Sequence, residues 1–196
     1  RERANQDKTV DGKENTGFAP LASAPVFVYH LPTPYRKRTA ILLIDIPYGP
    51  TFALRHLVLD YNGTLAVDGT LLPGVAEGIS EIARRLEVHV LTADTHGTVA
   101  AQLRGIPCHI HIVDTSPQDL AKLAYVRSLD PATVVCIGNG RNDRLMLKEA
   151  ALGIALIQQE GASVETLLNA DVVCTSILDA FDLFRKDGRL KATLRN

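Results

Sequence analysis

The chain has 196 residues, of which 46% are hydrophobic and 22% charged, and its formal net charge is −1. These values are typical of one globular domain that is long enough to bury a sizeable core. A net charge this close to zero gives no electrostatic reason to expect nucleic acid or an anionic membrane surface as a partner, and no apolar run approaches the roughly 20 residues that span a bilayer.

The first 38 residues predict a tail rather than part of the domain. Residues 1–17 are polar and lack any apolar period, so we expect them to be disordered. Residues 24–38 contain a brief apolar run between prolines, which either docks as an edge segment or stays loose. The predicted domain therefore comprises residues 39–196.

From residue 39 onwards, apolar strand-like runs alternate with helical patterns. Residues 65–71 predict a small hairpin around Asp68-Gly69, a dipeptide that favours tight turns. The stretch 52–60 reads as one strand or as a bent pair. Pro117 is placed at the first helical position of its helix, after Ser116 as the N-cap. The predicted strands are 40–46, 52–60, 88–92, 108–114, 133–138, 153–158 and 171–176, and the predicted helices are 73–86, 95–104, 116–129, 141–151, 163–170 and 177–195.

This alternation predicts an α/β fold with a doubly wound, mostly parallel sheet that is covered on both faces. The three cysteines Cys108, Cys136 and Cys174 lie in short apolar segments, and their odd number and wide spacing match neither a disulfide framework nor a zinc site. We expect buried, reduced thiols. Together with the lack of a visible signal peptide, they predict a cytoplasmic protein.

Polar residues follow the predicted strands at the points where the strands end. The segment 60–64, "DYNGT", follows one strand, 92–94, "TAD", follows the next, and 138–143, "GNGRND", follows a third. Lys122 lies on the predicted helix 116–129. Because ligands in such sheets bind beyond the carboxyl ends of the strands, these groups are expected to converge there. A carboxylate nucleophile, a hydroxyl, a cation and a second carboxylate are what phosphoryl transfer with Mg²⁺ requires.

These four segments, in this order, resemble the motifs of the haloacid dehalogenase (HAD) superfamily. The resemblance is to its small members related to the phosphorylation domain of P-type ATPases, and it spans about residues 40–196. The family's first motif reads D-x-D-G-T, or D-K-T-G-T in the ATPases, and its fourth reads G-D-G-x-N-D. The resemblance implies a HAD-like core in which the 65–71 hairpin is a minimal cap over an open site.

The resemblance also implies a role for each matching residue. Asp60 would attack phosphorus and form an aspartyl-phosphate, while Thr92 and Lys122 would hold the phosphoryl oxygens. The implied cofactor is Mg²⁺, and the implied substrate is a phosphorylated small molecule, a nucleotide or a phosphoprotein. The implied metal ligands are Asp60, Asn62 through its backbone carbonyl, Asn139 and Asp143, and the implied substrate-binding residues are Asn62, Gly63, Thr64, Ala93 and Asn142.

Two amides stand where the family has carboxylates, at Asn62 and Asn139. An amide does not exchange protons at neutral pH, so Asn62 cannot act as the general acid and base. We therefore expect slow hydrolysis and weak binding of Mg²⁺ without substrate. The alternative is a regulatory protein on the same fold that binds phosphate or a nucleotide without meaningful turnover.

Simpler interpretations of the same residues remain open at this point. Asn62-Gly63 is also a favourable hairpin turn, and Thr92 and Asp94 are suited to capping the turn and helix that follow. Lys122 is alternatively an exposed helical lysine, and Tyr61 either lines the pocket or packs. The histidines His89, His96, His109 and His111 are interpreted as structural or solvated rather than as ligands.

Overall fold

The computed structural model describes residues 27–29, 41–94, 97–113, 117–186 and 188–196. The predictions for residues 1–26 and 30–40, and for Ser116 as an N-cap, lie outside the described residues. Within the described part of the chain, no helix combines the length and the apolarity needed to cross a bilayer.

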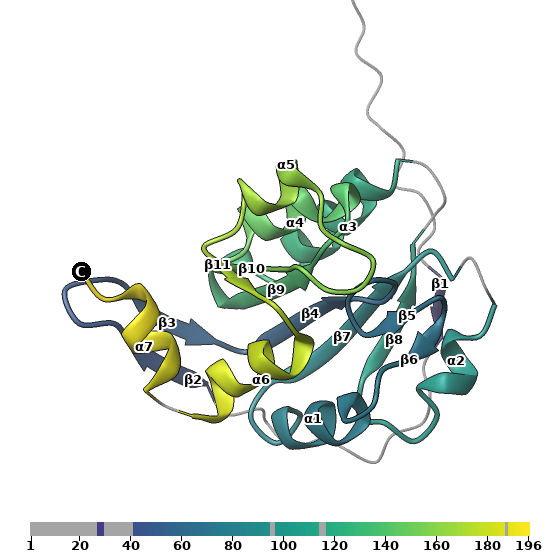
Figure 1. Ribbon diagram of the computed structural model, residues 1–196, viewed down its shortest axis with the longest axis horizontal. Helices are drawn as coiled ribbons and strands as arrows, with labels where there is room; N and C mark the ends of the chain where they lie inside the picture. Colours follow the sequence, from purple (N-terminus) through teal and green to yellow (C-terminus); the bar gives the residue numbers. More distant parts are fainter. Residues whose placement is uncertain (1–26, 30–40, 95–96, 114–116, 187) are drawn as a thin grey trace, which may run out of the picture.

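The core is a seven-stranded sheet in the order β1-β8-β7-β4-β9-β10-β11 (Figure 1). All neighbouring strands pair in parallel except β1, which is antiparallel to β8, so the predicted mostly parallel sheet is confirmed. The strands are β1 (Phe27–Tyr29), β4 (His56–Asp60), β7 (Glu87–Thr92), β8 (His109–Ile112), β9 (Val134–Gly138), β10 (Leu152–Leu156) and β11 (Val172–Cys174).

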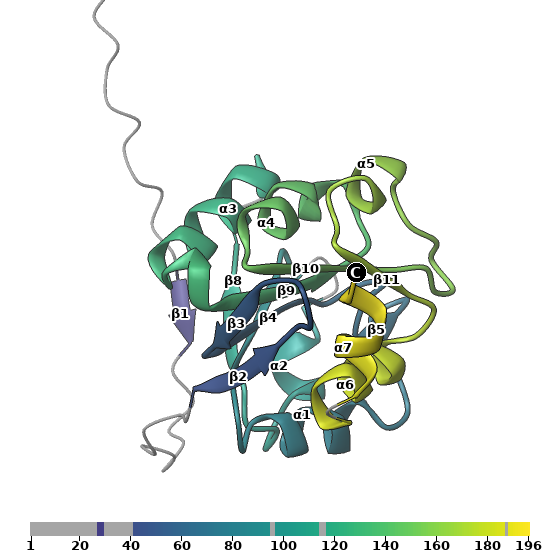
Figure 2. The ribbon, with the colours of Figure 1, turned by 90° about the vertical axis from the view of Figure 1, so that its left-hand side faces the viewer.

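Helices cover both faces of this sheet (Figure 2). One face carries α3 (Gln118–Ser128), α4 (Arg144–Glu149) and α5 (Val164–Leu167), and the other carries α1 (Val75–Ile82), α2 (Val99–Gln102) and α6 (Ile177–Arg185). Side chains of β4 alternate between the two layers. Leu57 and Leu59 belong to the core that contains Phe181 of α6, whereas Val58 belongs to the core that contains Val126 of α3. This alternation places His56 and Asp60 on the same face as Val58, the face covered by α3.

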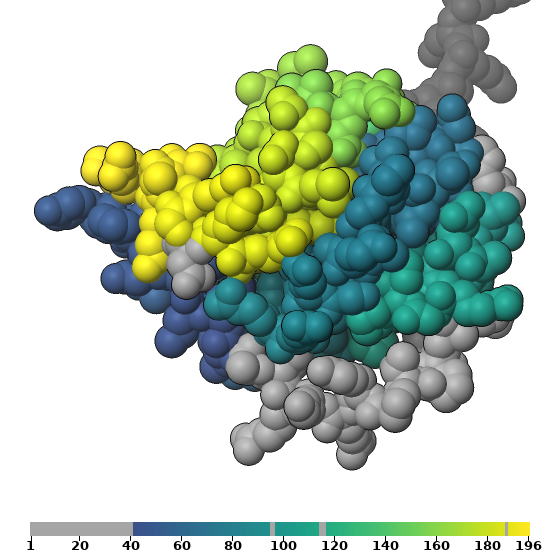
Figure 3. All heavy atoms as spheres, turned by 60° about the horizontal axis from the view of Figure 1, so that its bottom comes forward, coloured from purple at the N-terminus to yellow at the C-terminus, as the bar shows by residue number. Residues whose placement is uncertain are grey.

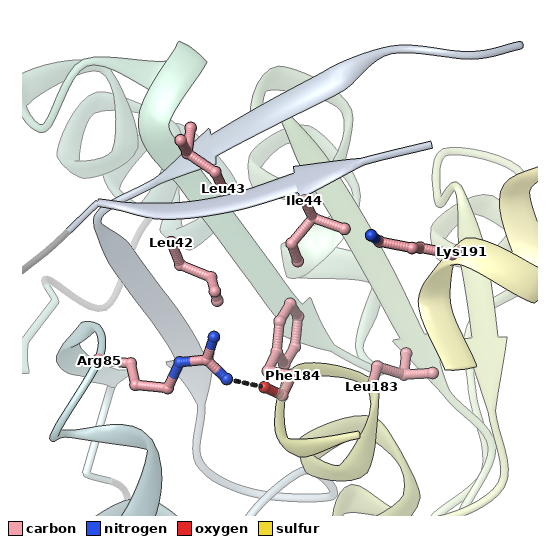
Figure 4. A pocket seen from close by; sticks show the side chains of 7 residues that line it. All are labelled: Leu42, Leu43, Ile44, Arg85, Leu183, Phe184 and Lys191. Atoms are coloured by element: carbon pink, nitrogen blue, oxygen red, sulfur yellow. Dashed lines mark hydrogen bonds between the residues drawn. The ribbon is translucent and has the colours of Figure 1, made fainter. Parts of the chain in front are cut away.

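A two-stranded antiparallel sheet lies apart from the central one. It consists of β2 (Leu42–Asp45) and β3 (Thr51–Leu54), and one residue, Arg55, separates β3 from β4, so the bent-pair interpretation of 52–60 is correct. The hairpin lies against the C-terminal segment (Figure 3). Between them is a surface pocket lined by Leu42, Phe184 and Arg85, among others, in which the Arg85 guanidinium donates to the backbone carbonyl of Phe184 over 2.9 Å (Figure 4).

The hairpin β5 (Ala66–Val67) and β6 (Thr70–Leu71) forms where it was predicted. Asp68 and Gly69 both have positive φ, 48° and 74°, as a tight hairpin turn requires.

Two helix predictions need correction. The stretch 177–195 contains two helices, α6 and α7 (Arg189–Leu194), because Lys186 is extended and ends α6. The helix predicted from 141 begins as a 3₁₀ turn, η2 (Arg141–Asp143).

A smaller correction concerns α3. It begins at Gln118, and Pro117, with an extended ψ of 117°, is its cap rather than its first helical residue. Another 3₁₀ turn, η1 (Pro131–Thr133), leads into β9.

Candidate active site

Asp60 ends β4, the strand that lies between β7 and β9 in the sheet. Directly after it the chain turns sharply, and the carbonyl of Tyr61 accepts from the backbone N–H of Leu65 (2.8 Å) and Ala66 (3.0 Å). Gly63 makes this turn possible with a φ of 76°, a conformation that a side chain disfavours. The candidate nucleophile, Asp60, therefore lies at the carboxyl edge of the sheet. A paired strand precedes it and a hydrogen-bonded turn follows it.

Lys122 of α3 brings the two predicted carboxylates together. Its Nζ donates to Asp60 Oδ1 and to Asp143 Oδ1, each over 2.6 Å, and its side chain is only 1% exposed. The interpretation of Lys122 as an exposed helical lysine is thus wrong. We call these three residues the charged triad.

The backbone fixes the second carboxylate. Asp143 is fully buried, and its Oδ2 accepts from the backbone N–H of Asn139 (3.0 Å) and of Gly140 (2.9 Å). Gly138 makes room for it, since a Cβ at this position would lie 2.5 Å from Asp143 Oδ2. The glycines and the acid of "GNGRND" thus serve to aim one carboxylate oxygen at Lys122.

The electrostatics of the charged triad are those of a site prepared for a cation. Burial acts to lower the pKa of Lys122, but the charges of Asp143 and Asp60 outweigh it, so the pKa is raised and the ammonium stays charged. Burial and the Asp60 charge raise the pKa of Asp143 to about 6, against the opposing effect of Lys122. Two carboxylates and one ammonium leave a net charge of −1 when all are ionised. A phosphate dianion could approach this site only with a further cation.

Thr92 and Asp94 perform the capping roles left open above. Thr92 is buried at the end of β7, beside β4, and its Oγ1 accepts from the backbone N–H of Asp94 over 3.0 Å. Asp94 Oδ1 accepts from the backbone N–H of Thr98 (3.1 Å) and Val99 (3.2 Å), at the start of α2. Ala93, between them, is half-buried.

Asn139 joins two loops at the site. Its Nδ2 donates to the carbonyl of Gly161 over 3.0 Å, and its Oδ1 accepts from Thr64 Oγ1 over 3.3 Å. A Cβ on Gly63 would lie 2.3 Å from the Asn139 amide, so the three residues are in close contact. An amide oxygen has two lone pairs, so Asn139 Oδ1 could bind a metal and still accept from Thr64. The role of Asn139 as a metal ligand stays a prediction.

Asn62 and Asn142 differ in how their amides are used. Asn142 Nδ2 donates to Gln118 Oε1 over 2.6 Å, which links η2 to the start of α3. Asn62 Oδ1, in contrast, is buried and has no hydrogen-bond partner among the described residues. A buried oxygen acceptor of this kind has a cost unless a donor or a cation satisfies it. The carboxylates of Asp60 and Asp143 and the amide oxygens of Asn62 are all oxygen donors, the type of ligand that Mg²⁺ prefers.

Two residues that support the site, Gln158 and Glu160, belong to no motif and were missed, and a third, Tyr61, lies within the first motif. Gln158 Nε2 donates to the carbonyls of Gly63 (3.0 Å) and Thr64 (2.9 Å), and its Oε1 accepts from the backbone N–H of Ile177 over 2.6 Å. The other two hold the cap: Tyr61 Oη donates to the Gly69 carbonyl, and Glu160 Oε1 accepts from the Asp68 N–H. Tyr61 is 1% exposed, so it packs in the interior rather than lining the pocket.

No protein-family model matches the chain. The uncharacterized protein MJ0073 of Methanocaldococcus jannaschii is 43% identical over 83 residues, which are 40% of this chain and 89% of that protein. A copper-exporting P-type ATPase of Staphylococcus saprophyticus is 28% identical over 151 residues, which cover 76% of this chain but 18% of the ATPase.

Solved structures with the same fold include 3-deoxy-D-manno-octulosonate 8-phosphate phosphatases. That of Moraxella catarrhalis, in complex with a magnesium ion, a phosphate ion and a KDO molecule, is 16% identical with a TM-score of 0.57, and the match covers 68% of this chain and 87% of that chain. The cobalt-bound phosphatase of Haemophilus influenzae is 14% identical with a TM-score of 0.53. This match covers 73% of this chain and 94% of the phosphatase chain. The chain has the fold of these phosphatases and of a putative HAD superfamily hydrolase from Legionella pneumophila, and by sequence it belongs to one family with the M. jannaschii protein MJ0073.

Proposed function

We propose that this protein is a Mg²⁺-dependent phosphohydrolase that acts through an aspartyl-phosphate on Asp60. The observation that carries the proposal is the charged triad, which is buried at the carboxyl edge of the sheet and has a net negative charge. Structural surroundings of this kind, with perturbed pKa values and a specific charge partner, are typical of catalytic sites.

The chain's own groups have separable tasks in this proposal. Asp60 supplies the attacking oxygen, and the bond from that oxygen to phosphorus forms as the bond to the leaving group breaks. Lys122 neutralises charge on the transferring phosphoryl oxygens, and the hydroxyl of Thr92 donates to one of them. Gly63, Thr64, Ala93 and Asn142 would shape the surroundings of the substrate.

Mg²⁺ fits the oxygen donors present, and Asp60, Asp143 and the backbone carbonyl of Asn62 would hold it. When bound, it supplies positive charge that lets a phosphate dianion approach the carboxylates. The structural neighbours that contain magnesium or cobalt support this choice of cofactor.

We further propose that turnover is slow. Asn62 stands two residues after Asp60, and its amide can neither protonate a leaving group nor deprotonate the water that hydrolyses the aspartyl-phosphate. A phosphorylated small molecule is the proposed substrate, by analogy with the sugar phosphatases of the same fold. Nucleotides and phosphoproteins are further candidates, since the hairpin cap is small.

Hydrolysis of p-nitrophenyl phosphate and ATP by the purified protein, with and without Mg²⁺, tests the proposal. We expect Mg²⁺-dependent release of product, phosphorylation of Asp60 detectable by mass spectrometry after acid quenching, and loss of both in Asp60→Asn. Asp130→Asn is the matched control, because Asp130 is exposed with a positive φ of 67°, which asparagine also tolerates.

Failure of wild type and control alike to hydrolyse or become phosphorylated would contradict the proposal. Binding of inorganic phosphate or ATP in that case would favour the second candidate, a regulatory protein that uses the site for recognition. Asn62 and Asn139, which replace two carboxylates, are the observations that favour this candidate.

A further inference from the structure

A second polar cluster lies at the opposite end of the sheet from the charged triad. His56 begins β4 and Glu87 begins β7, and the two residues are register partners in adjacent parallel strands. His89 follows Glu87 by two residues, so its side chain leaves the same face. Asp60 and His56 are the two ends of β4, four residues apart, which is roughly 13 Å along an extended strand.

The polar atoms of this cluster converge on one point. His56 Nδ1 lies 3.1 Å from His89 Nε2 and 3.5 Å from Glu87 Oε2, and all three atoms lie within 4.8 Å of one another. Ligand atoms bound tetrahedrally to Zn²⁺ at about 2.0–2.1 Å are about 3.3–3.4 Å apart. The two short separations bracket this value and the third is within 4.8 Å, so side-chain rotations that bring the third pair closer would let the three atoms surround an ion.

Tyr125 of α3 holds one imidazole in the orientation that a metal site needs. Its Oη lies 2.9 Å from His89 Nδ1 and also contacts His111 Nε2. A proton on His89 Nδ1, donated to Tyr125, leaves the Nε2 lone pair directed at His56 and Glu87. Ligating histidines regularly use their second ring nitrogen in this way, and such partners tune metal affinity.

The charges of the cluster also suit a divalent ion. Burial first, and then the neighbouring His56, His109 and His111, together lower the pKa of His89 to about 2, so the ring is neutral, which is the form that binds metals. Glu87 contributes one negative charge, and its side chain is 38% exposed, which leaves the cluster accessible from solvent. His109 Nε2 lies 3.0 Å from Glu87 Oε1, beside the open side of the site.

We propose that His56 Nδ1, His89 Nε2 and the Glu87 carboxylate bind one Zn²⁺ ion, or a similar divalent transition metal ion, at the amino-terminal edge of the sheet. Two imidazoles and one carboxylate with an open fourth position form a donor set that Zn²⁺ accepts and Mg²⁺ does not favour. The ion would link β4 to β7 and, through Tyr125, fix α3 one helical turn from Lys122. The site does not depend on the proposed phosphohydrolase activity.

Titration calorimetry with Zn²⁺, on chelator-treated protein in an excess of Mg²⁺, tests the proposal. We expect one equivalent of Zn²⁺ to bind, and at least 10-fold weaker binding in His56→Gln and in Glu87→Gln. Tyr125→Phe, which removes the hydroxyl that contacts His89 and His111 but none of the proposed ligands, is expected to weaken binding by about 10-fold. Glu77→Gln, which removes an exposed carboxylate on α1, on the other face of the sheet, is the control and is expected to bind as wild type.

Two further measurements keep the outcome unambiguous. Asp60→Asn should leave Zn²⁺ binding unchanged, because the charged triad is a different site. Co²⁺ should give the visible absorption of a tetrahedral nitrogen–oxygen site in wild type but not in His56→Gln. Zn²⁺ binding that is lost in Asp60→Asn but kept in His56→Gln and Glu87→Gln would overturn the proposal, as would no binding at all.

Discussion

Asn62 is the residue on which the proposed rate depends. It follows the nucleophile by two positions, and its Oδ1 is buried without a hydrogen-bond partner in the described part of the chain. A carboxyl group at this point would be of the same size and would add a proton that can be exchanged. The difference between the two side chains is therefore chemical rather than steric.

Asn62→Asp is expected to raise kcat by at least about 10-fold. General acid–base catalysis typically contributes about 10²–10⁴-fold to the rate, and the new carboxyl group would restore part of that contribution. The rate of p-nitrophenyl phosphate hydrolysis and the decay of the phosphorylated protein would both be measured. The double variant with Asp60→Asn is the control, and it should lose the gain. An unchanged kcat would show that proton transfer at this position does not limit the reaction.

Lys122 supports the fold as well as the site. Lys122→Met would leave Asp60 and Asp143 buried beside each other without a cation, and removal of one partner from a buried ion pair costs about 3–5 kcal/mol of unfolding free energy. Urea unfolding would measure this loss. The double variant with Asp143→Asn removes one of the stranded charges and should recover part of the stability. Equal stability of wild type and Lys122→Met would contradict this account.

At the scale of elements, one side chain joins three segments that are distant in sequence. Gln158 binds the turn after β4 through two carbonyls and the start of α6 through one N–H. It thus keeps the turn that follows Asp60 at a fixed distance from the β10–β11 loop.

Gln158→Glu tests this link with almost no change in shape, since only the donor to the two carbonyls is lost. We expect a loss of about 1–3 kcal/mol of unfolding free energy, the cost of buried groups left unpaired. We also expect kcat to fall, because the Asp60 turn is less firmly held. Gln102→Glu, on α2, is the matched control. Unchanged stability and kcat would mean that the turn holds without Gln158.

The elements were largely predictable because each is a local pattern. Apolar runs predicted the strands β9 and β10, both of which are fully buried, and Asp68-Gly69 predicted the hairpin turn. The break at Lys186 was missed because the apolar spacing of α6 and α7 reads as one helix. The separation of β3 from β4 depends on a bend at a single residue, which no periodicity specifies.

The site was predictable only as far as strand ends identify it. Asp60, Lys122 and Asp143 could be brought together from motif order and parallel topology. The capping roles of Thr92 and Asp94 were among the interpretations left open, whereas the contacts of Gln158 depend on a loop conformation that a sequence pattern does not encode. The histidine cluster was likewise missed, because each histidine was interpreted alone and the strand register that unites His56, Glu87 and His89 was unknown.

At the scale of the whole molecule, stability should depend on pH through His89. The pKa of this ring is lowered to about 2 in the folded protein, against 6.5 for a free histidine. Between these values the unfolded chain binds a proton here and the folded protein does not, so acid favours unfolding. Above pH 6.5 both states are neutral at this position and the effect is absent.

We therefore expect His89 to lower the unfolding free energy by about 1.4 kcal/mol at pH 5.5 relative to pH 7.5. Urea unfolding at both values, with EDTA present to remove bound metal, would measure it. His89→Gln, which is neutral throughout, should show a smaller loss on acidification than wild type. Equal losses in the two proteins would show that His89 is protonated in the folded state.

β4 carries one end of each polar cluster, with His56 at its start and Asp60 at its finish. Insertion or deletion of a single residue within it would reverse the facing of every side chain on one side of the change. Either Asp60 would then leave Lys122, or His56 would leave His89. Changes in chain length during the divergence of this family should therefore accumulate in the turns on either side of β4, while the strand itself keeps its five residues.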